Sequence, residues 1–134
     1  MLTLSFALQP QLQDLSRHYP LWVDDWYRFV IVLGVRLPPG FNYDTTDVLI
    51  EIPTDYPFVP PGLGDSRVYV NSGLRFYNQP LAEYRENTYP DYPTFGFGPW
   101  AWVCYRTISW DPMRDDLIGF VEMLRADLTN PPTK

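Results

Sequence analysis

Two stretches of the chain repeat their apolar residues with the period of an α-helix. Residues 113–128 carry the clearer pattern, because leucine, phenylalanine and valine recur there three, four and seven positions apart, on one helical face. We expect Asp111 to cap this helix, with Pro112 at its first position and a T-N-P-P sequence at its end. A shorter pattern at residues 10–19, stopped by Pro20, predicts an N-terminal helix.

Between these helices, the apolar residues form runs that are typical of β-strands. The run at 22–37 is rich in β-branched and aromatic side chains, and shorter runs follow at 47–53 and 67–71. Residues 74–99 contain four prolines and two glycines, so we expect a long and mostly irregular segment there. This order, with a helix near each end and strands between them, predicts one α+β domain over residues 1–134.

Composition and charge narrow the classes of function. Of the 134 residues, 46% are hydrophobic, and the formal net charge is −6. The chain can therefore bury a core, but it lacks the basic surface typical of nucleic-acid binders. No run is long enough for a membrane span, and no signal peptide is evident, which predicts a cytoplasmic protein. With His18 as the only histidine and Cys104 as the only cysteine, we expect no metal site, no internal disulfide and no cofactor.

Cys104 lies in the most distinctive stretch of the sequence, W-A-W-V-C-Y-R-T-I-S-W-D-P at residues 100–112. Three of the five tryptophans belong to this stretch. A free cysteine is commonly a buried small hydrophobe, and this interpretation stays open beside that of a nucleophile in an aromatic cleft. We expect five residues to form cleft walls and structural support: Tyr56, Pro57, Trp100, Trp102 and Trp110.

Four features follow one another in a distinctive order along the chain. A strand runs into a tyrosine-proline loop, the lone cysteine follows, a W-D-P sequence comes next, and a leucine-rich helix ends in L-T-N-P. These features are I-E-I-P at 50–53 with Tyr56-Pro57 and Pro60-Pro61, then Cys104, Trp110-Asp111-Pro112 and residues 128–131. In this order they resemble the ubiquitin-conjugating enzyme superfamily. L-P-P-G at 37–40, and the W-x9-W spacing of Trp100 and Trp110 followed by D-D-L at 115–117, look more like its bacterial branch, which is found beside ubiquitin-like proteins and activating enzymes. The resemblance covers roughly residues 28–131.

The resemblance implies both a fold and a reaction. The fold would be UBC-like, with an N-terminal helix, an antiparallel meander of three or four strands, and a C-terminal helix packed on the sheet. The long segment before Cys104 would be the active-site loop. The reaction would begin with transfer of a ubiquitin-like protein from an activating-enzyme-like partner to Cys104, where it is held as a thioester. It would end with transfer to an amine of a target protein. Bacterial relatives that carry serine at this position leave an oxyester open, and their setting suggests antiphage defence.

This chemistry suggests roles for residues other than Cys104. In a strand, Arg106 would share a face with Cys104 and favour the thiolate. The family's His-Pro-Asn sequence is missing. Its nearest counterpart, Asn71, lies 33 positions before Cys104 and is a candidate oxyanion donor together with Asn87. Three carboxylates are candidates for deprotonating the incoming amine: Asp55, Glu86 and Asp111.

A second hypothesis, from another class of function, is a non-catalytic binding module of the same fold. Cys104 would then be incidental, and an exposed aromatic surface would bind a partner, since aromatic residues are enriched at interfaces. That surface would comprise Tyr77, Tyr84, Tyr89, Tyr92 and Phe95. A third hypothesis is an unrelated α+β domain. Access of a small thiol reagent to Cys104 separates the first two hypotheses.

Overall fold

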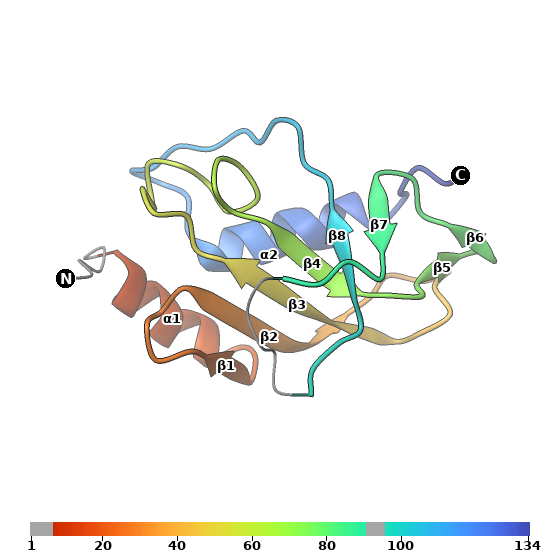
Figure 1. The fold of residues 1–134 in the computed structure, drawn as a ribbon, viewed down its shortest axis with the longest axis horizontal. Helices are drawn as coiled ribbons and strands as arrows, with labels where there is room; N and C mark the ends of the chain where they lie inside the picture. The colour runs from red at the N-terminus through yellow and green to blue at the C-terminus, as the bar shows by residue number, and fades with distance from the viewer. Residues whose placement is uncertain (1–6, 91–95) are drawn as a thin grey trace.

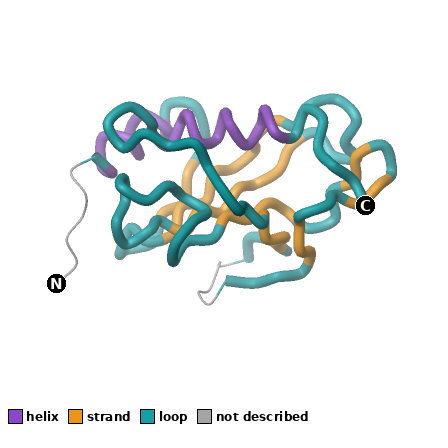
Figure 2. Tube along the Cα trace, turned by 90° about the horizontal axis from the view of Figure 1, so that it is seen from above, coloured by secondary structure: helices purple, strands orange, loops and turns teal. Residues whose placement is uncertain are grey.

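A computed structural model describes residues 7–90 and 96–134, which form a two-layer α+β arrangement (Figure 1). In chain order the elements are α1 (Leu8–Ser16), β1 (Leu21–Val23), β2 (Phe29–Arg36), β3 (Thr45–Glu51), β4 (Val68–Asn71), β5 (Arg75–Phe76), β6 (Gln79–Pro80), β7 (Tyr84–Glu86), β8 (Trp100–Val103) and α2 (Leu117–Asp127). Figure 2 shows the helices on one side of the strands. The predicted α+β class, with a helix near each end of the chain, is confirmed.

Six strands form one sheet in the order β1-β2-β3-β4-β8-β7, and each neighbouring pair is antiparallel. The strands β1 to β4 make the predicted meander, and β8 and β7 extend it beyond β4 (Figure 1). A separate hairpin joins β5 to β6 through Tyr77 and Asn78, whose positive φ angles are those of a type I′ turn. The described residues of 74–99 are mostly irregular, as predicted, but the short strands β5, β6 and β7 among them were not predicted. Strands of two or three residues are too short to show a periodic pattern.

Alternation along the strands divides the apolar residues between the two faces of the sheet. The face toward the helices holds the larger cluster, which includes the whole apolar stripe predicted for the C-terminal helix. The residues of this stripe, the last of which is the C-cap of α2, are at most 1% exposed: Leu117, Phe120, Val121, Leu124 and Leu128. The opposite face holds a second cluster: Phe29, Ile31, Leu49, Tyr69 and Trp100. No helix in the described parts of the chain has the length and apolar content needed to cross a membrane.

The C-terminal helix begins later than predicted. Asp116 is its N-cap, because the carboxylate accepts a hydrogen bond from the Gly119 amide at 2.8 Å. Asp111 instead closes an isolated turn, in which its carboxylate accepts from the Met113 amide at 3.0 Å. The prediction of Asp111 as helix cap, with Pro112 at the first helical position, was therefore wrong. Both aspartates are suitable caps, and the packing of the apolar stripe against the sheet selects the second.

Candidate functional site

Cys104 follows β8 directly and lies at the centre of a tight turn. The Tyr105 amide donates to the Val103 carbonyl at 3.0 Å, an i to i+2 hydrogen bond that defines a γ-turn. The Cys104 amide donates to the Glu83 carbonyl at 2.9 Å, and Sγ lies 3.8 Å from the carbonyl oxygen of Trp102. The backbone therefore holds the thiol at the end of a strand, and the residue is half-buried.

A hollow of 480 Å³ lies beside Cys104, with walls from the start of β7, the end of β8 and the C-terminal end of α2. The chain after α2 forms part of the wall and is paired to residue 82, because the Ala82 amide donates to the Pro132 carbonyl at 2.9 Å. A volume of this order accommodates a side chain or a short peptide segment. Residues with polar side chains also line the hollow, besides Cys104 itself: Glu83, Tyr84, Tyr105, Asp127, Thr129 and Asn130.

Burial controls the protonation of three groups in this hollow. It raises the pKa of the Asp127 carboxyl above its ordinary value. Burial also raises the pKa of Tyr84, and the nearby Asp127 carboxylate raises it further. The pKa of Tyr105 is raised by burial first, and then by Tyr84 and Asp127. Both phenols therefore keep their protons at neutral pH, and Asp127 holds its proton to a higher pH than an exposed aspartate.

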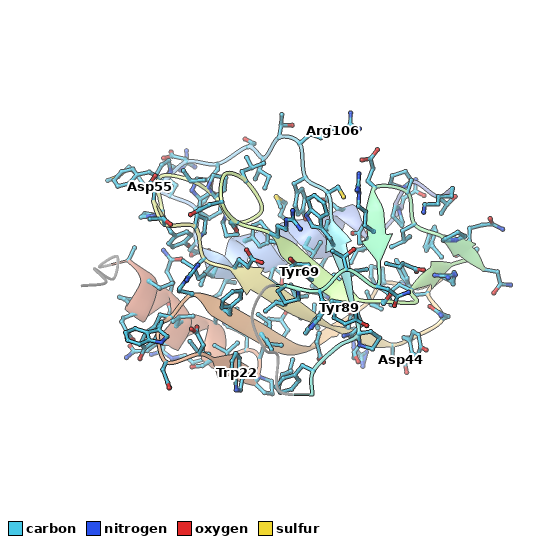
Figure 3. All side chains as sticks on the ribbon, viewed as in Figure 1. Trp22, Asp44, Asp55, Tyr69, Tyr89 and Arg106 are labelled. Atoms are coloured by element: carbon cyan, nitrogen blue, oxygen red, sulfur yellow. The ribbon has the colours of Figure 1, made fainter. Side chains whose placement is uncertain are left out.

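Arg106 does not share a strand face with Cys104, because β8 ends at Val103 and the chain turns at Cys104. The Arg106 side chain is 85% exposed, and its guanidinium lies 3.8 Å from the Glu83 carboxylate. Figure 3 shows Arg106 at the outer edge of the molecule. Water screens an exposed charge of this kind, so its effect on the thiol is small.

The two asparagines predicted as oxyanion donors lie at the other end of β8. Asn71 is opposite the first residue of β8, which strand geometry places about 10 Å from the Cys104 end. Its side-chain oxygen accepts a hydrogen bond from the Asp47 amide at 2.9 Å. Asn87 follows β7 near that same end, and its side-chain oxygen lies 3.4 Å from the Ser72 hydroxyl. The structure therefore does not bring either asparagine to Cys104.

None of the three predicted carboxylates lines the hollow. Glu86 forms an ion pair with Arg75, which lowers the pKa of Glu86. Asp111 closes the turn before α2, and Figure 3 shows Asp55 on a loop far from Arg106. Asp127 lines the hollow instead. Sequence reasoning missed it because a polar residue beside the apolar stripe of a helix has no distinguishing local signal.

Three of the predicted support residues join the tyrosine-proline loop to the helices. The Trp110 indole donates to the Pro57 carbonyl at 2.7 Å, and its ring centroid lies 6.1 Å from that of Tyr56. The Tyr56 hydroxyl bonds to the Gln11 side chain, which also accepts from the Leu117 amide at 3.0 Å. One glutamine of α1 therefore links the loop to the start of α2.

The other two tryptophans belong to the sheet and not to the hollow. Trp100 is fully buried on the face without helices. Trp102 packs on the same face, with the Arg67 guanidinium 4.1 Å and the Arg85 guanidinium 5.4 Å from its ring. Residues two apart in a strand share a face, so this placement follows from their spacing. Neither ring lines the hollow beside Cys104.

The aromatic surface predicted for a binding module is not assembled from the described residues. Tyr77 and Tyr89 are exposed, at 70% and 62%. Tyr84 packs against the core on the helix side of the sheet. Tyr92 and Phe95 lie outside the described residues.

Comparisons of the chain with protein-family models, with curated proteins and with solved structures found no match. Across residues 7–90 and 96–134, no group of three or more histidine, cysteine, aspartate or glutamate side chains is placed to hold a metal ion.

Proposed function

We propose that this chain is a ubiquitin-conjugating-enzyme-like carrier, in which Cys104 accepts a ubiquitin-like protein and passes it to an amine. The observation that carries the proposal is a half-buried thiol on the wall of a hollow that also contains Asp127, a carboxyl with a raised pKa. Such pairs of a nucleophile and a perturbed acid are typical of functional sites. An inert cysteine would pack in the core, whereas Cys104 belongs to neither apolar cluster of the described residues.

The order of elements supports a UBC-like fold for this domain. A helix precedes a meander, the tyrosine-proline loop connects β3 to β4, and the lone cysteine comes before the W-D-P sequence and the last helix. The 2.7 Å hydrogen bond between Trp110 and Pro57 joins two motifs that lie 53 positions apart in the sequence. This contact supports a shared structural role for the tyrosine-proline loop and the W-D-P sequence. The strand β8 lies between β4 and β7, and Cys104 follows its last residue, next to the hollow.

Two acyl transfers make up the proposed reaction. In the first, the Cys104 thiolate attacks the carbonyl carbon of a thioester on an activating-enzyme-like partner. The new carbon–sulfur bond forms while the old one breaks, and the partner's thiolate leaves. In the second, an amine nitrogen of the target attacks the same carbon. A carbon–nitrogen bond forms, the bond to Cys104 breaks, and Cys104 leaves as a thiolate.

The second transfer also needs an acceptor for the proton that the amine loses. We assign this role to Asp127, which lies on the wall of the same hollow as Cys104. A raised pKa brings a carboxylate closer to the operating pH and makes it a stronger base than an exposed aspartate. The apolar wall around it favours a neutral amine over an ammonium ion.

A transfer assay with the cognate activating enzyme, ATP and ubiquitin-like protein tests the function. We expect the wild type to form a covalent adduct that dithiothreitol removes on non-reducing gels, and Cys104→Ala to form none. An adduct on Cys104→Ser that resists thiols and yields to hydroxide would identify an oxyester carrier. If the wild type forms no adduct while the activating enzyme is visibly charged, the carrier function is wrong, and a non-catalytic binding module becomes the better hypothesis.

A thiol-labelling control separates a failed carrier from an inaccessible cysteine. Cys104 is the only cysteine in the sequence, so a small disulfide reagent reports on one site. We expect the native protein to react at a measurable rate, because the residue is half-buried and lines an open hollow. Protection of the thiol until the protein unfolds would contradict the proposed placement of Cys104.

A further inference from the structure

The Tyr105 hydroxyl is a polar group that the resting structure leaves unsatisfied. Its oxygen is buried, and within the described parts of the chain it is the one buried side-chain nitrogen or oxygen that lacks a hydrogen-bond partner. Folded proteins pair nearly all such groups, because an unpaired one lowers stability. A buried hydroxyl without an acceptor in the protein can donate its hydrogen bond to a bound group that reaches it.

The ring that carries this hydroxyl is held from two sides. On one side, the Phe120 ring of α2 lies 6.0 Å away between centroids, at an interplanar angle of 64°. On the other side, the chain comes so close at Gly62 that a Cβ there would lie 2.9 Å from Tyr105 Cδ2. The tyrosine-proline loop and the last helix therefore fix the position of the ring. A donor fixed before the reaction stabilises developing charge without reorganising.

Tyr105 also belongs to the same hollow as the reacting sulfur. Tyr105 follows Cys104 in the chain, and both residues line the same hollow. Tyr84 and Asp127, which also line it, are close enough to the Tyr105 phenol to raise its pKa after burial has done so. The phenol therefore keeps its proton at neutral pH and acts as a donor.

We propose that Tyr105 is a catalytic residue, whose hydroxyl donates a hydrogen bond to the oxyanion formed when the thioester carbonyl on Cys104 is attacked. This inference rests on the proposed carrier function. The hydroxyl keeps its proton: it stabilises the negative oxygen while the carbon–nitrogen bond forms and the carbon–sulfur bond breaks. The role is the one predicted for Asn71 or Asn87, both of which lie at the other end of β8.

The test replaces Tyr105 by phenylalanine, which removes the hydroxyl and keeps the ring. The probe is a thioester of a short peptide ending in Gly-Gly, which loads Cys104 without an activating enzyme; the purified adduct is then discharged with free lysine. We expect discharge to be about 100-fold slower in Tyr105→Phe, the loss typical of removing one oxyanion donor. We expect the melting temperature to stay equal or to rise, because an unpaired buried hydroxyl has been removed.

Three control variants make the assignment specific. Tyr77→Phe removes an exposed hydroxyl on the β5–β6 hairpin and should discharge at the wild-type rate. Tyr84→Phe removes the other phenol of the hollow and should change the rate less than about threefold, because it is not the proposed donor. Asn130→Ala removes the one amide side chain on the wall, which is the competing donor.

Each other outcome overturns the assignment in a recognisable way. Discharge of Tyr105→Phe at the wild-type rate refutes the role of Tyr105 and leaves the carrier function intact. A loss of similar size in Tyr84→Phe would indicate a general effect of polarity, and a loss only in Asn130→Ala would transfer the role to that residue. A lower melting temperature of Tyr105→Phe would mean that the hydroxyl has a partner. If the peptide thioester does not load wild-type Cys104, the carrier function itself fails.

Discussion

The two ends of β8 differ in how completely their polar groups are paired. At the Trp100 end, the side-chain oxygen of the neighbouring Asn71 accepts from the Asp47 amide at 2.9 Å. The backbone amide of Asn71 donates to the Thr46 hydroxyl, also at 2.9 Å. At the Cys104 end, the Tyr105 hydroxyl has no partner among the described residues, and a carboxyl with a raised pKa faces the same hollow. The polar groups described at the first end are paired, whereas the second end has a buried hydroxyl without a partner among the described residues.

This difference follows from how the sheet is built. Over residues 101–103, β8 lies between β4 and β7, and at its start the buried Trp100 indole fills the second apolar cluster. At its other end, β8 stops at Val103 and the chain turns, so Cys104 and Tyr105 lie beyond the strand. Polar groups that remain unpaired in a native structure commonly mark functional sites. Variants at one end should therefore change stability, and variants at the other should change reactivity.

The largest effect should come from Trp100→Ala, at the paired end. The side chain is fully buried, so we expect the free energy of unfolding to fall by about 3–5 kcal/mol. Urea denaturation monitored by circular dichroism measures this loss. Trp102→Ala is the matched control, because that ring is only half-buried between two arginines. An equal loss in both variants would mean that the paired end is not the more stable one.

A smaller loss should follow from Asn71→Ala. This variant removes the acceptor of the Asp47 amide, and one such hydrogen bond contributes about 1–1.5 kcal/mol to the free energy of unfolding. We expect the labelling rate of Cys104 in the folded protein to stay unchanged, because the two residues lie at opposite ends of β8. A large fall in adduct discharge, with normal loading, would return Asn71 to the list of oxyanion donors.

The next prediction concerns the pH dependence of stability at the Cys104 end. Burial raises the pKa of Asp127 in the folded state above its unfolded value of 3.8, so the folded state binds this proton more tightly. Wild-type stability should therefore carry a term that decreases as pH rises from about 4 through the raised pKa. The Asp127→Asn variant has no carboxyl at this position, so its free energy of unfolding lacks this pH-dependent term. Its melting temperature relative to wild type should increase between pH 3 and pH 7.

Subtracting the two pH profiles isolates Asp127, because the other carboxyls titrate alike in both proteins. The ion pair with Arg75 lowers the pKa of Glu86, so this residue contributes stability that is lost at low pH, the opposite sign. A difference between Asp127→Asn and wild type that does not change with pH would contradict the desolvation of Asp127. The same variant should discharge its adduct to lysine more slowly than wild type at neutral pH.

The smallest effect should come from Arg106→Gln. The side chain is 85% exposed, and its guanidinium lies 3.8 Å from the Glu83 carboxylate. Exposed charges of this kind interact weakly in water, so we expect the labelling rate of Cys104 to change less than about twofold. Raising the salt concentration should reduce even that change. A tenfold slower reaction would mean that the arginine activates the thiol after all.

The sequence by itself determined the features that depend on local patterns. The apolar stripe of α2 was readable because a helix repeats its buried face every three to four residues. The strands β2, β3 and β4 were readable because β-branched and aromatic residues cluster in them. The lone cysteine and the tyrosine-proline loop were visible as residue types. Each of these signals lies within one short window of the chain.

Only the tertiary structure decided which residues surround Cys104. Asn71 was expected beside it from the family resemblance and Arg106 from its spacing, yet strand register and a tight turn place their side chains elsewhere. Asp127 and Tyr84 were not expected, and they reach the hollow because the end of α2 packs beside β7. Pairing between distant segments, and the burial that raises these pKa values, arise from packing over long sequence distances, which no local pattern encodes.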